Sequence, residues 1–105
     1  MTVTYVSPEQ ARALQQQGVP IIDVRGPEEW QTGIAEAART VTKTELELQA
    51  CHHIEGADSP VILICAGGKR SDACSAVLAG QGYQILYSVI GGTQAWKDAG
   101  LPMQA

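Results

Sequence analysis

Residues 61–71 read Val61-Ile62-Leu63-Ile64-Cys65-Ala66-Gly67-Gly68-Lys69-Arg70-Ser71, and this stretch decides the fold. Its first half is the strongest strand signal in the chain, because a continuous apolar run is typical of a parallel strand buried on both faces. The glycine pair predicts a loop over 66–69. Residues 71–79 then predict a helix whose inward side chains are Ala73, Cys74, Val77 and Leu78.

The chain on either side of this stretch alternates between strand and helix patterns. Helices are predicted from Pro8, over 26–30, after Thr42 and at 93–99, with capping boxes at Ser7/Gln10 and Thr42/Glu45. Further strands are predicted at Thr2–Val6, Ile21–Val24 and Ile85–Val89, and Gly91-Gly92 as a turn. Alternation of this kind favours crossover connections. We therefore predict an α/β fold, a small parallel-sheet domain with helices on both faces, formed by a single domain over residues 1–105.

Composition excludes several classes of function. The chain has 105 residues, 45% hydrophobic and 17% charged, which is enough for one core and untypical of disorder. A net charge of -4 with only seven scattered Lys and Arg residues argues against nucleic acid. No apolar run approaches the roughly 20 residues that span a bilayer, and the N-terminus lacks a signal-peptide pattern. We expect a cytoplasmic protein that binds neither nucleic acid nor membrane.

Cys65 stands where open parallel sheets place their ligands, at the carboxyl end of the central strand. Gly67 and Gly68 allow successive N–H groups to point inward, and the following helix adds its N-terminal dipole. Lys69 and Arg70 add positive charge if their side chains turn the same way. All of these features favour a thiolate over a thiol. Lowering an ordinary cysteine pKa of roughly 8.5 by two units requires under ~3 kcal/mol.

The other candidate groups have plainer interpretations. Judged alone, Cys65 could be a small buried hydrophobe, and Cys74 is expected to be a core residue rather than a resolving thiol. Cys51-His52-His53 could suggest a metal site, but adjacent histidines on a helix point in different directions and no fourth ligand follows at metal spacing. We expect no metal and no cofactor. An odd number of cysteines without a CxxC pair indicates free thiols.

Four segments, in order and at matching spacing, resemble the rhodanese family. They are Ile22-Asp23-Val24-Arg25 with Glu28-Glu29-Trp30, the loop Cys65–Ser71 as C-x-x-G-x-R-S, Gly80-Gln81-Gly82-Tyr83, and Gly91-Gly92 with Trp96, Gly100 and Pro102 as G-G-x-x-x-W…G-x-P. Two departures are visible. The family's G-H-I-x-G-A stretch is here Gly33-Ile34-Ala35-Glu36-Ala37, without the His and the second Gly, and the often polar residue after the cysteine is Ala66.

The resemblance implies a rhodanese-like sulfurtransferase with Cys65 as catalytic nucleophile. Sulfane sulfur would move from a small sulfur-anion donor such as thiosulfate to a thiol, cyanide or protein acceptor, through a persulfide on Cys65. The resemblance places Ala66, Gly67, Gly68, Lys69, Arg70 and Ser71 in the persulfide-binding loop. It gives Asp23 and Arg25 a structural role, joining a strand end to neighbouring loops.

Two alternatives stay open on the sequence. A cysteine phosphatase or arsenate reductase would resemble C-x-x-x-x-x-R, one residue longer than the C-x-x-x-x-R found between Cys65 and Arg70. A non-catalytic binding or regulatory module of the same family would be expected to lack the cysteine or part of the loop, and this chain keeps both.

Overall fold

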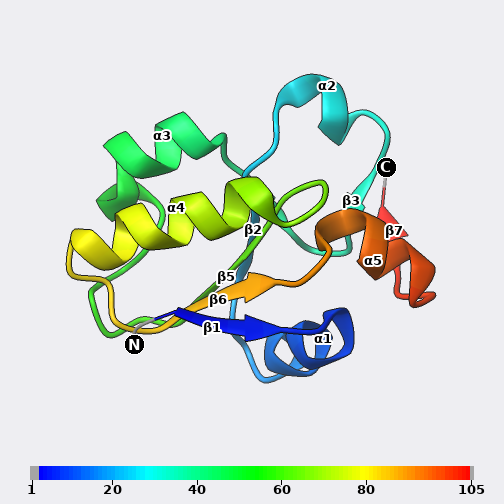
Figure 1. The fold of residues 1–105 in the computed structure, drawn as a ribbon, viewed down its shortest axis with the longest axis horizontal. Coiled ribbons are helices and arrows are strands. Elements are labelled where there is room, and N and C mark those ends of the chain that lie inside the picture. The colour runs from blue at the N-terminus through cyan, green and yellow to red at the C-terminus, as the bar shows by residue number, and fades with distance from the viewer. Residues whose placement is uncertain (1–2, 105) are drawn as a thin grey trace.

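A computed structural model of the chain describes residues 3–104 (Figure 1). The elements in chain order are β1 (Val3–Val6), α1 (Pro8–Gln16), β2 (Ile21–Asp23), α2 (Pro27–Trp30), β3 (Ile34–Ala35), β4 (Arg39–Thr40), α3 (Lys43–Leu48), the 3-10 turn η1 (Ala50–His52), β5 (Val61–Ile64), α4 (Lys69–Gly80), β6 (Leu86–Val89), α5 (Gly92–Asp98) and β7 (Met103–Gln104). Thr2, the first residue of the first predicted strand, lies outside the described residues. The other predicted strands and helices are found within one or two residues of their expected bounds.

The sheet has five strands in the order β1-β6-β5-β2-β4, and every pairing in it is parallel. The predicted parallel sheet is therefore confirmed, with β5 at its centre. A separate antiparallel pair, β3 with β7, was not predicted and holds Ile34 opposite Gln104. Two-residue strands leave too little sequence pattern to be recognised.

The side chains of β5 and of Cys65, which follows it, alternate between two hydrophobic cores. Val61, Leu63 and Cys65 join one cluster with residues of α3 and α4, whereas Ile62 and Ile64 join another with residues of α1 and α5. All five side chains are at most 1% exposed. Figure 1 shows the two pairs of helices on opposite sides of the sheet, which confirms the predicted helices on both faces. Burial of each such aliphatic side chain contributes about 1.5–3 kcal/mol.

The inward face of α4 differs from the prediction. Cys74 and Leu78 are buried as expected, but Ala73 and Val77 are exposed and Ser75 takes a core position. Ser71, Cys74, Ser75 and Leu78 follow one another at intervals of three or four residues around the helix, so they lie on the same face of α4. A serine can occupy it because its hydroxyl finds a partner: Ser75 Oγ donates to Ser71 O over 2.7 Å.

The helix starts agree only in part with the sequence pattern. The Ser7/Gln10 capping box is present in both directions. At α3, Thr42 Oγ1 accepts the Glu45 N–H over 3.2 Å, but the Glu45 carboxylate lies 3.1 Å from His53 Nε2 instead of closing the box. The second predicted capping box is therefore only half formed: the hydrogen bond from the Thr42 backbone N–H to the Glu45 side chain is missing, because His53 outside the helix binds that carboxylate.

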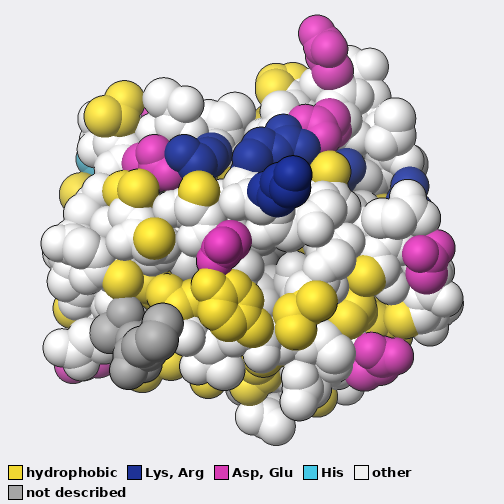
Figure 2. All heavy atoms as spheres, in the orientation of Figure 1, with side chains coloured by type: hydrophobic (Ala, Val, Ile, Leu, Met, Phe, Trp, Pro, Cys, Tyr) yellow, Lys and Arg dark blue, Asp and Glu magenta, His cyan; other side chains and the backbone are white. Residues whose placement is uncertain are grey.

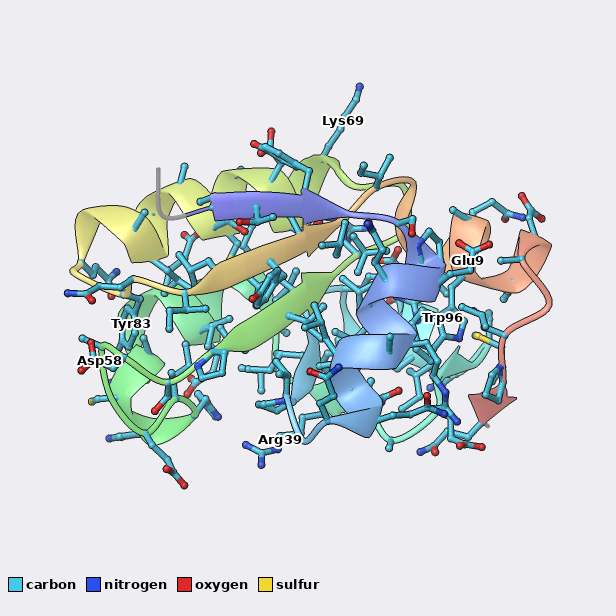
Figure 3. The ribbon with its side chains drawn as sticks, turned by 90° about the horizontal axis from the view of Figure 1, so that it is seen from below. Glu9, Arg39, Asp58, Lys69, Tyr83 and Trp96 are labelled. Carbon is cyan, nitrogen blue, oxygen red and sulfur yellow. The ribbon has the colours of Figure 1, made fainter. Side chains whose placement is uncertain are left out.

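Trp96 anchors the last helix from within the second core. Its side chain is 0% exposed, and its indole Nε1 donates to Pro102 O over 2.8 Å. Figure 3 shows Trp96 directed inward from α5. Among residues 3–104, no helix has both the length and the apolar character needed to cross a membrane.

Candidate active site at the end of the central strand

Cys65 follows β5 directly and its thiol lies at the start of α4. The residue is 1% exposed, and Gly68 donates its N–H to Sγ over 3.1 Å. The Sγ–Oγ distance to Ser71 is 3.5 Å. Gly68 is the N-cap of α4 with φ +106°, a conformation that glycine adopts without strain. The left-handed turn at Gly68 aims the first amides of α4 at the sulfur.

The surroundings of the thiol lower its pKa. Burial raises the pKa of Cys65, but the Ser71 hydroxyl and the backbone N–H groups of Ser71, Gly68 and Arg70 lower it by more. Each of these donors is stronger toward an anion than toward a neutral sulfur. The backbone N–H groups near the sulfur belong to Gly68, Arg70 and Ser71, three of the six residues that sequence reasoning placed in the loop.

The carbonyl groups on the other side of the loop are held by α5. Thr93 N–H donates to Cys65 O over 2.7 Å, and Gln94 N–H donates to Ala66 O over 3.2 Å. This approach requires glycine at residue 92. A Cβ there would lie 2.7 Å from Ala66 O and closer still to Cys65 O. The predicted turn at Gly91-Gly92 is therefore the start of a helix pressed against the cysteine backbone, which sequence reasoning did not foresee.

The two basic residues of the loop do not point at the sulfur together. Figure 3 shows Lys69 extending away from the domain, and its side chain is exposed. The guanidinium of Arg70 donates two hydrogen bonds to the Glu29 carboxylate, from Nη1 to Oε1 over 2.6 Å and from Nη2 to Oε2 over 2.7 Å. These hydrogen bonds lower the pKa of Glu29 to about 2. Figure 2 shows basic side chains gathered over the start of α4, with acidic ones beside them.

Asp23 and Arg25 form a buried ion pair beneath the loops. Asp23 is 0% and Arg25 5% exposed, and Nη2 of Arg25 lies 2.8 Å from Oδ2 of Asp23. The same Nη2 donates to Gly33 O over 2.8 Å, and the Arg25 backbone N–H donates to Asp23 Oδ1 over 3.0 Å. The pair links the end of β2 to the chain leaving α2. A charge pair as enclosed as this is costly to break from one side.

Ser88 is a site residue that sequence reasoning missed. It lies on β6, is 1% exposed, and its Oγ is 3.1 Å from Ser71 Oγ. Its only sequence signal was a hydroxyl inside an otherwise apolar strand. The parallel pairing of β5 with β6 places it opposite Leu63, one strand away from the cysteine.

Two hollows flank the loop. One, of about 330 Å³, borders Ala66 and is also lined by Arg25, Glu28, Glu29, Thr32, Thr93, Gln94 and Lys97. The other, of about 250 Å³, borders Gly67, Gly68 and Lys69 beside Tyr5 and Ile90. Both hollows lie beside the loop that follows Cys65.

The remaining thiols and histidines form no second centre. Burial raises the pKa of Cys74 to about 12, and Cys51 is exposed. Within the described part of the chain, no three His, Cys, Asp or Glu side chains are grouped to hold a metal ion.

An α/β domain that presents one cysteine in a loop of amides defines a class of group-transfer proteins, and comparisons with known proteins give the family. The model of the Rhodanese-like domain family matches residues 7–99. The thiosulfate sulfurtransferase GlpE of Actinobacillus succinogenes is 38% identical, covering 99% of this chain and 93% of its own. The chain therefore belongs to the rhodanese-like domain family. The predicted class, a rhodanese-type sulfurtransferase, is confirmed.

Solved structures agree on the fold. A rhodanese-related protein from Thermoplasma volcanium superposes with a TM-score of 0.82 at 26% identity, covering 95% of this chain and 96% of its own. A protein of unknown function from Rhodopseudomonas palustris, described as a possible tyrosine phosphatase, gives 0.85 at 27% identity, covering 97% and 85%. The predicted α/β fold is confirmed.

Proposed function

We propose that the chain is a thiosulfate sulfurtransferase that carries sulfane sulfur as a persulfide on Cys65. The observation that carries the proposal is the buried sulfur of Cys65, which accepts the Gly68 N–H over 3.1 Å and whose pKa is lowered by its donors. The name of the relative from Actinobacillus succinogenes supports thiosulfate as the donor.

The reaction is two displacements at sulfur. The Cys65 thiolate attacks the outer sulfur of thiosulfate, the sulfur–sulfur bond of the donor breaks, and sulfite leaves with the bonding electron pair. The outer sulfur remains on Cys65 as an anionic persulfide. A thiolate or cyanide then attacks that sulfur, giving a new persulfide or thiocyanate and returning the Cys65 thiolate. Because the enzyme holds the sulfur between the two steps, ping-pong kinetics follow.

The loop serves both steps through its backbone. The N–H groups of Gly68, Arg70 and Ser71 stabilise the thiolate and would stabilise the persulfide in the same place. Lys69 lies in solvent, where it would attract an incoming anion at long range. Arg70 would fix the loop to α2 through its ion pair with Glu29. The acceptor would be a small thiol, cyanide or a protein thiol, and a cytoplasmic, single-domain protein stays a prediction.

The test is the intact mass of the purified chain after thiosulfate, with and without a thiol reductant. We expect a gain of one sulfur atom that the reductant reverses. The Cys65→Ser variant should show no gain, whereas the Cys51→Ser variant, which removes an exposed thiol, should gain sulfur as the parent does. In the parent, Cys65 should also react with iodoacetamide faster at neutral pH than Cys51.

The opposite results would reject the proposal. If thiosulfate and a low-molecular-weight persulfide both leave the mass unchanged, Cys65 is not a sulfur carrier. Hydrolysis of an aryl phosphate that depends on Cys65 would favour the phosphatase alternative instead. The loop, one residue shorter than the phosphatase pattern, leads us to expect no such hydrolysis.

A further inference from the structure

A chain of buried hydroxyl groups runs from the neighbouring strand to the thiol. Ser88 Oγ lies 3.1 Å from Ser71 Oγ, which in turn lies 3.5 Å from Cys65 Sγ. Ser71 Oγ is also 3.1 Å from Gly68 O. Ser71 is 0% and Ser88 1% exposed. Buried hydroxyls need partners, and these are the ones available to Ser71.

The hydrogen count limits how this group can be arranged. A serine hydroxyl has one proton to donate and two positions at which it accepts. When Cys65 is a thiol, it can donate to Ser71 Oγ while Ser71 donates to Gly68 O. When Cys65 is a thiolate, its sulfur can only accept a hydrogen bond. The carbonyl oxygen of Gly68 can likewise only accept one. Ser71 can then donate its one proton either to the sulfur or to Gly68 O, but not to both. Of the groups next to the Ser71 hydroxyl, Ser88 is the one that can still donate a proton.

We propose that Ser88 is a positioning residue whose hydroxyl donates to Ser71 and so directs the Ser71 proton onto the sulfur of Cys65. Donation from Ser88 fills the acceptor position that the thiol proton vacates. It also polarises the Ser71 hydroxyl, because hydrogen bonds in a chain strengthen one another. The same arrangement would serve the inner sulfur of the persulfide. This inference rests on the proposed function for its relevance to catalysis.

The position of Ser88 on the sheet makes the arrangement rigid. Ser88 is paired with Tyr5 of β1 on one side and with Leu63 of β5 on the other. Its backbone is therefore held within three parallel strands. A hydroxyl fixed in this way constrains Ser71 more closely than a loop residue could.

The experiment measures the thiol directly, without a sulfur donor. The rate of Cys65 alkylation by iodoacetamide is followed against pH by peptide mass analysis, with Cys51 in the same chain as the internal reference. Ser88→Ala should raise the pH midpoint of Cys65 and lower its alkylation rate below that midpoint by about three- to tenfold. Ser88→Thr keeps the hydroxyl and should restore the parent profile. Arg70, Glu29 and Cys74, the nearby charged and titratable groups, are unchanged in every variant.

Ser75→Ala is the matched control. It also removes one buried hydroxyl beneath α4, but that hydroxyl donates to the Ser71 carbonyl and not to its Oγ. We expect the Cys65 midpoint of Ser75→Ala to equal that of the parent. A shift in Ser75→Ala as large as in Ser88→Ala would mean that any loss of packing there moves the thiol, and the proposal would be wrong.

A double variant separates a relay from two independent effects. If Ser88 acts through Ser71, then Ser71→Ala combined with Ser88→Ala shifts the midpoint no further than Ser71→Ala alone. Additive shifts, or a parent-like profile in Ser88→Ala, overturn the assignment. A chain that shows the coupled shifts but takes no sulfur from thiosulfate contradicts the proposed function and leaves the role of Ser88 standing.

Discussion

Replacing Gly92 by Ala should damage both the stability and the active-site loop. Gly92 begins α5 at φ +59°, and a Cβ there would lie 2.7 Å from Ala66 O, with Cys65 O nearer still. The left-handed backbone costs an alanine about 1–2 kcal/mol. Overpacking against a rigid backbone adds about 1–3 kcal/mol. Loss of the Thr93 N–H bond to Cys65 O removes about 1 kcal/mol more. We expect a total loss of about 3–6 kcal/mol.

Gly100→Ala provides the matched control at the other end of the same helix. Gly100 also has a left-handed backbone, φ +74°, but nothing lies within 4 Å of a Cβ built on it. We therefore expect only the conformational cost of about 1–2 kcal/mol. The entropy that alanine removes from the unfolded chain is the same in both variants and cancels in the comparison.

Urea unfolding followed by circular dichroism measures the two losses on one scale. Gly92→Ala should be less stable than Gly100→Ala by about 2–4 kcal/mol. Under conditions where both are folded, Cys65 of Gly92→Ala should be alkylated more slowly than Cys65 of Gly100→Ala, because α5 can no longer hold its carbonyl. Equal stability and equal alkylation in the two variants would refute the idea that close approach at Gly92 shapes the loop.

Two further predictions concern other parts of the chain. Ala37 has φ +65° in a turn closed by the hydrogen bond from Ala38 N–H to Ala35 O, at the position where the family pattern has a glycine. Ala37→Gly should therefore raise the free energy of unfolding by about 0.5–1 kcal/mol. An unchanged or lower urea midpoint would contradict this. The pKa of Glu29 is lowered to about 2 by Arg70, below its ordinary value, so the pair stabilises the fold above the unfolded pKa and loses that effect as pH falls from about 4.3 to about 2. The side chains of Glu29 and Arg70 are both more than a third exposed, so the difference in unfolding free energy between the parent and Glu29→Gln should stay under ~1 kcal/mol at neutral pH. This difference should vanish near pH 2. A difference that stays constant with pH would show that the carboxylate charge does not cause it.

The sequence predicts the parts of this fold that depend on local pattern. The apolar run before Cys65 gave a central parallel strand, since only a strand with helices on both sides can bury every side chain. The chain positions of the strands and of the five longer helical segments followed from periodicity, caps and glycines. The two-residue strands β3, β4 and β7 have no comparable pattern, and their pairing depends on tertiary contacts.

The differences from the prediction concern the buried face of α4 and the partner of Arg70. Ser75 was not among the side chains predicted to face inward, yet it is buried and a carbonyl one turn earlier accepts its hydroxyl proton. Val77 was placed inside because it is apolar, and it is 40% exposed. Arg70 was expected to add positive charge at the thiol only if its side chain turned that way, and Glu29, 41 residues earlier in the chain, binds its guanidinium. No local pattern reveals such a partner.

Formal charge was therefore given too much weight in the expected activation of Cys65. Lys69 lies in solvent and Arg70 is paired with Glu29. The largest causes that lower the pKa of the thiol are oriented donors without net charge, the Ser71 hydroxyl and backbone N–H groups. Two helix starts meet at one residue: α4 supplies N–H groups to the sulfur of Cys65, and α5 supplies an N–H to its carbonyl oxygen. The glycines at 68 and 92 make both approaches possible. Because donors fixed in this way need no rearrangement when charge develops, they can stabilise the thiolate and the persulfide alike.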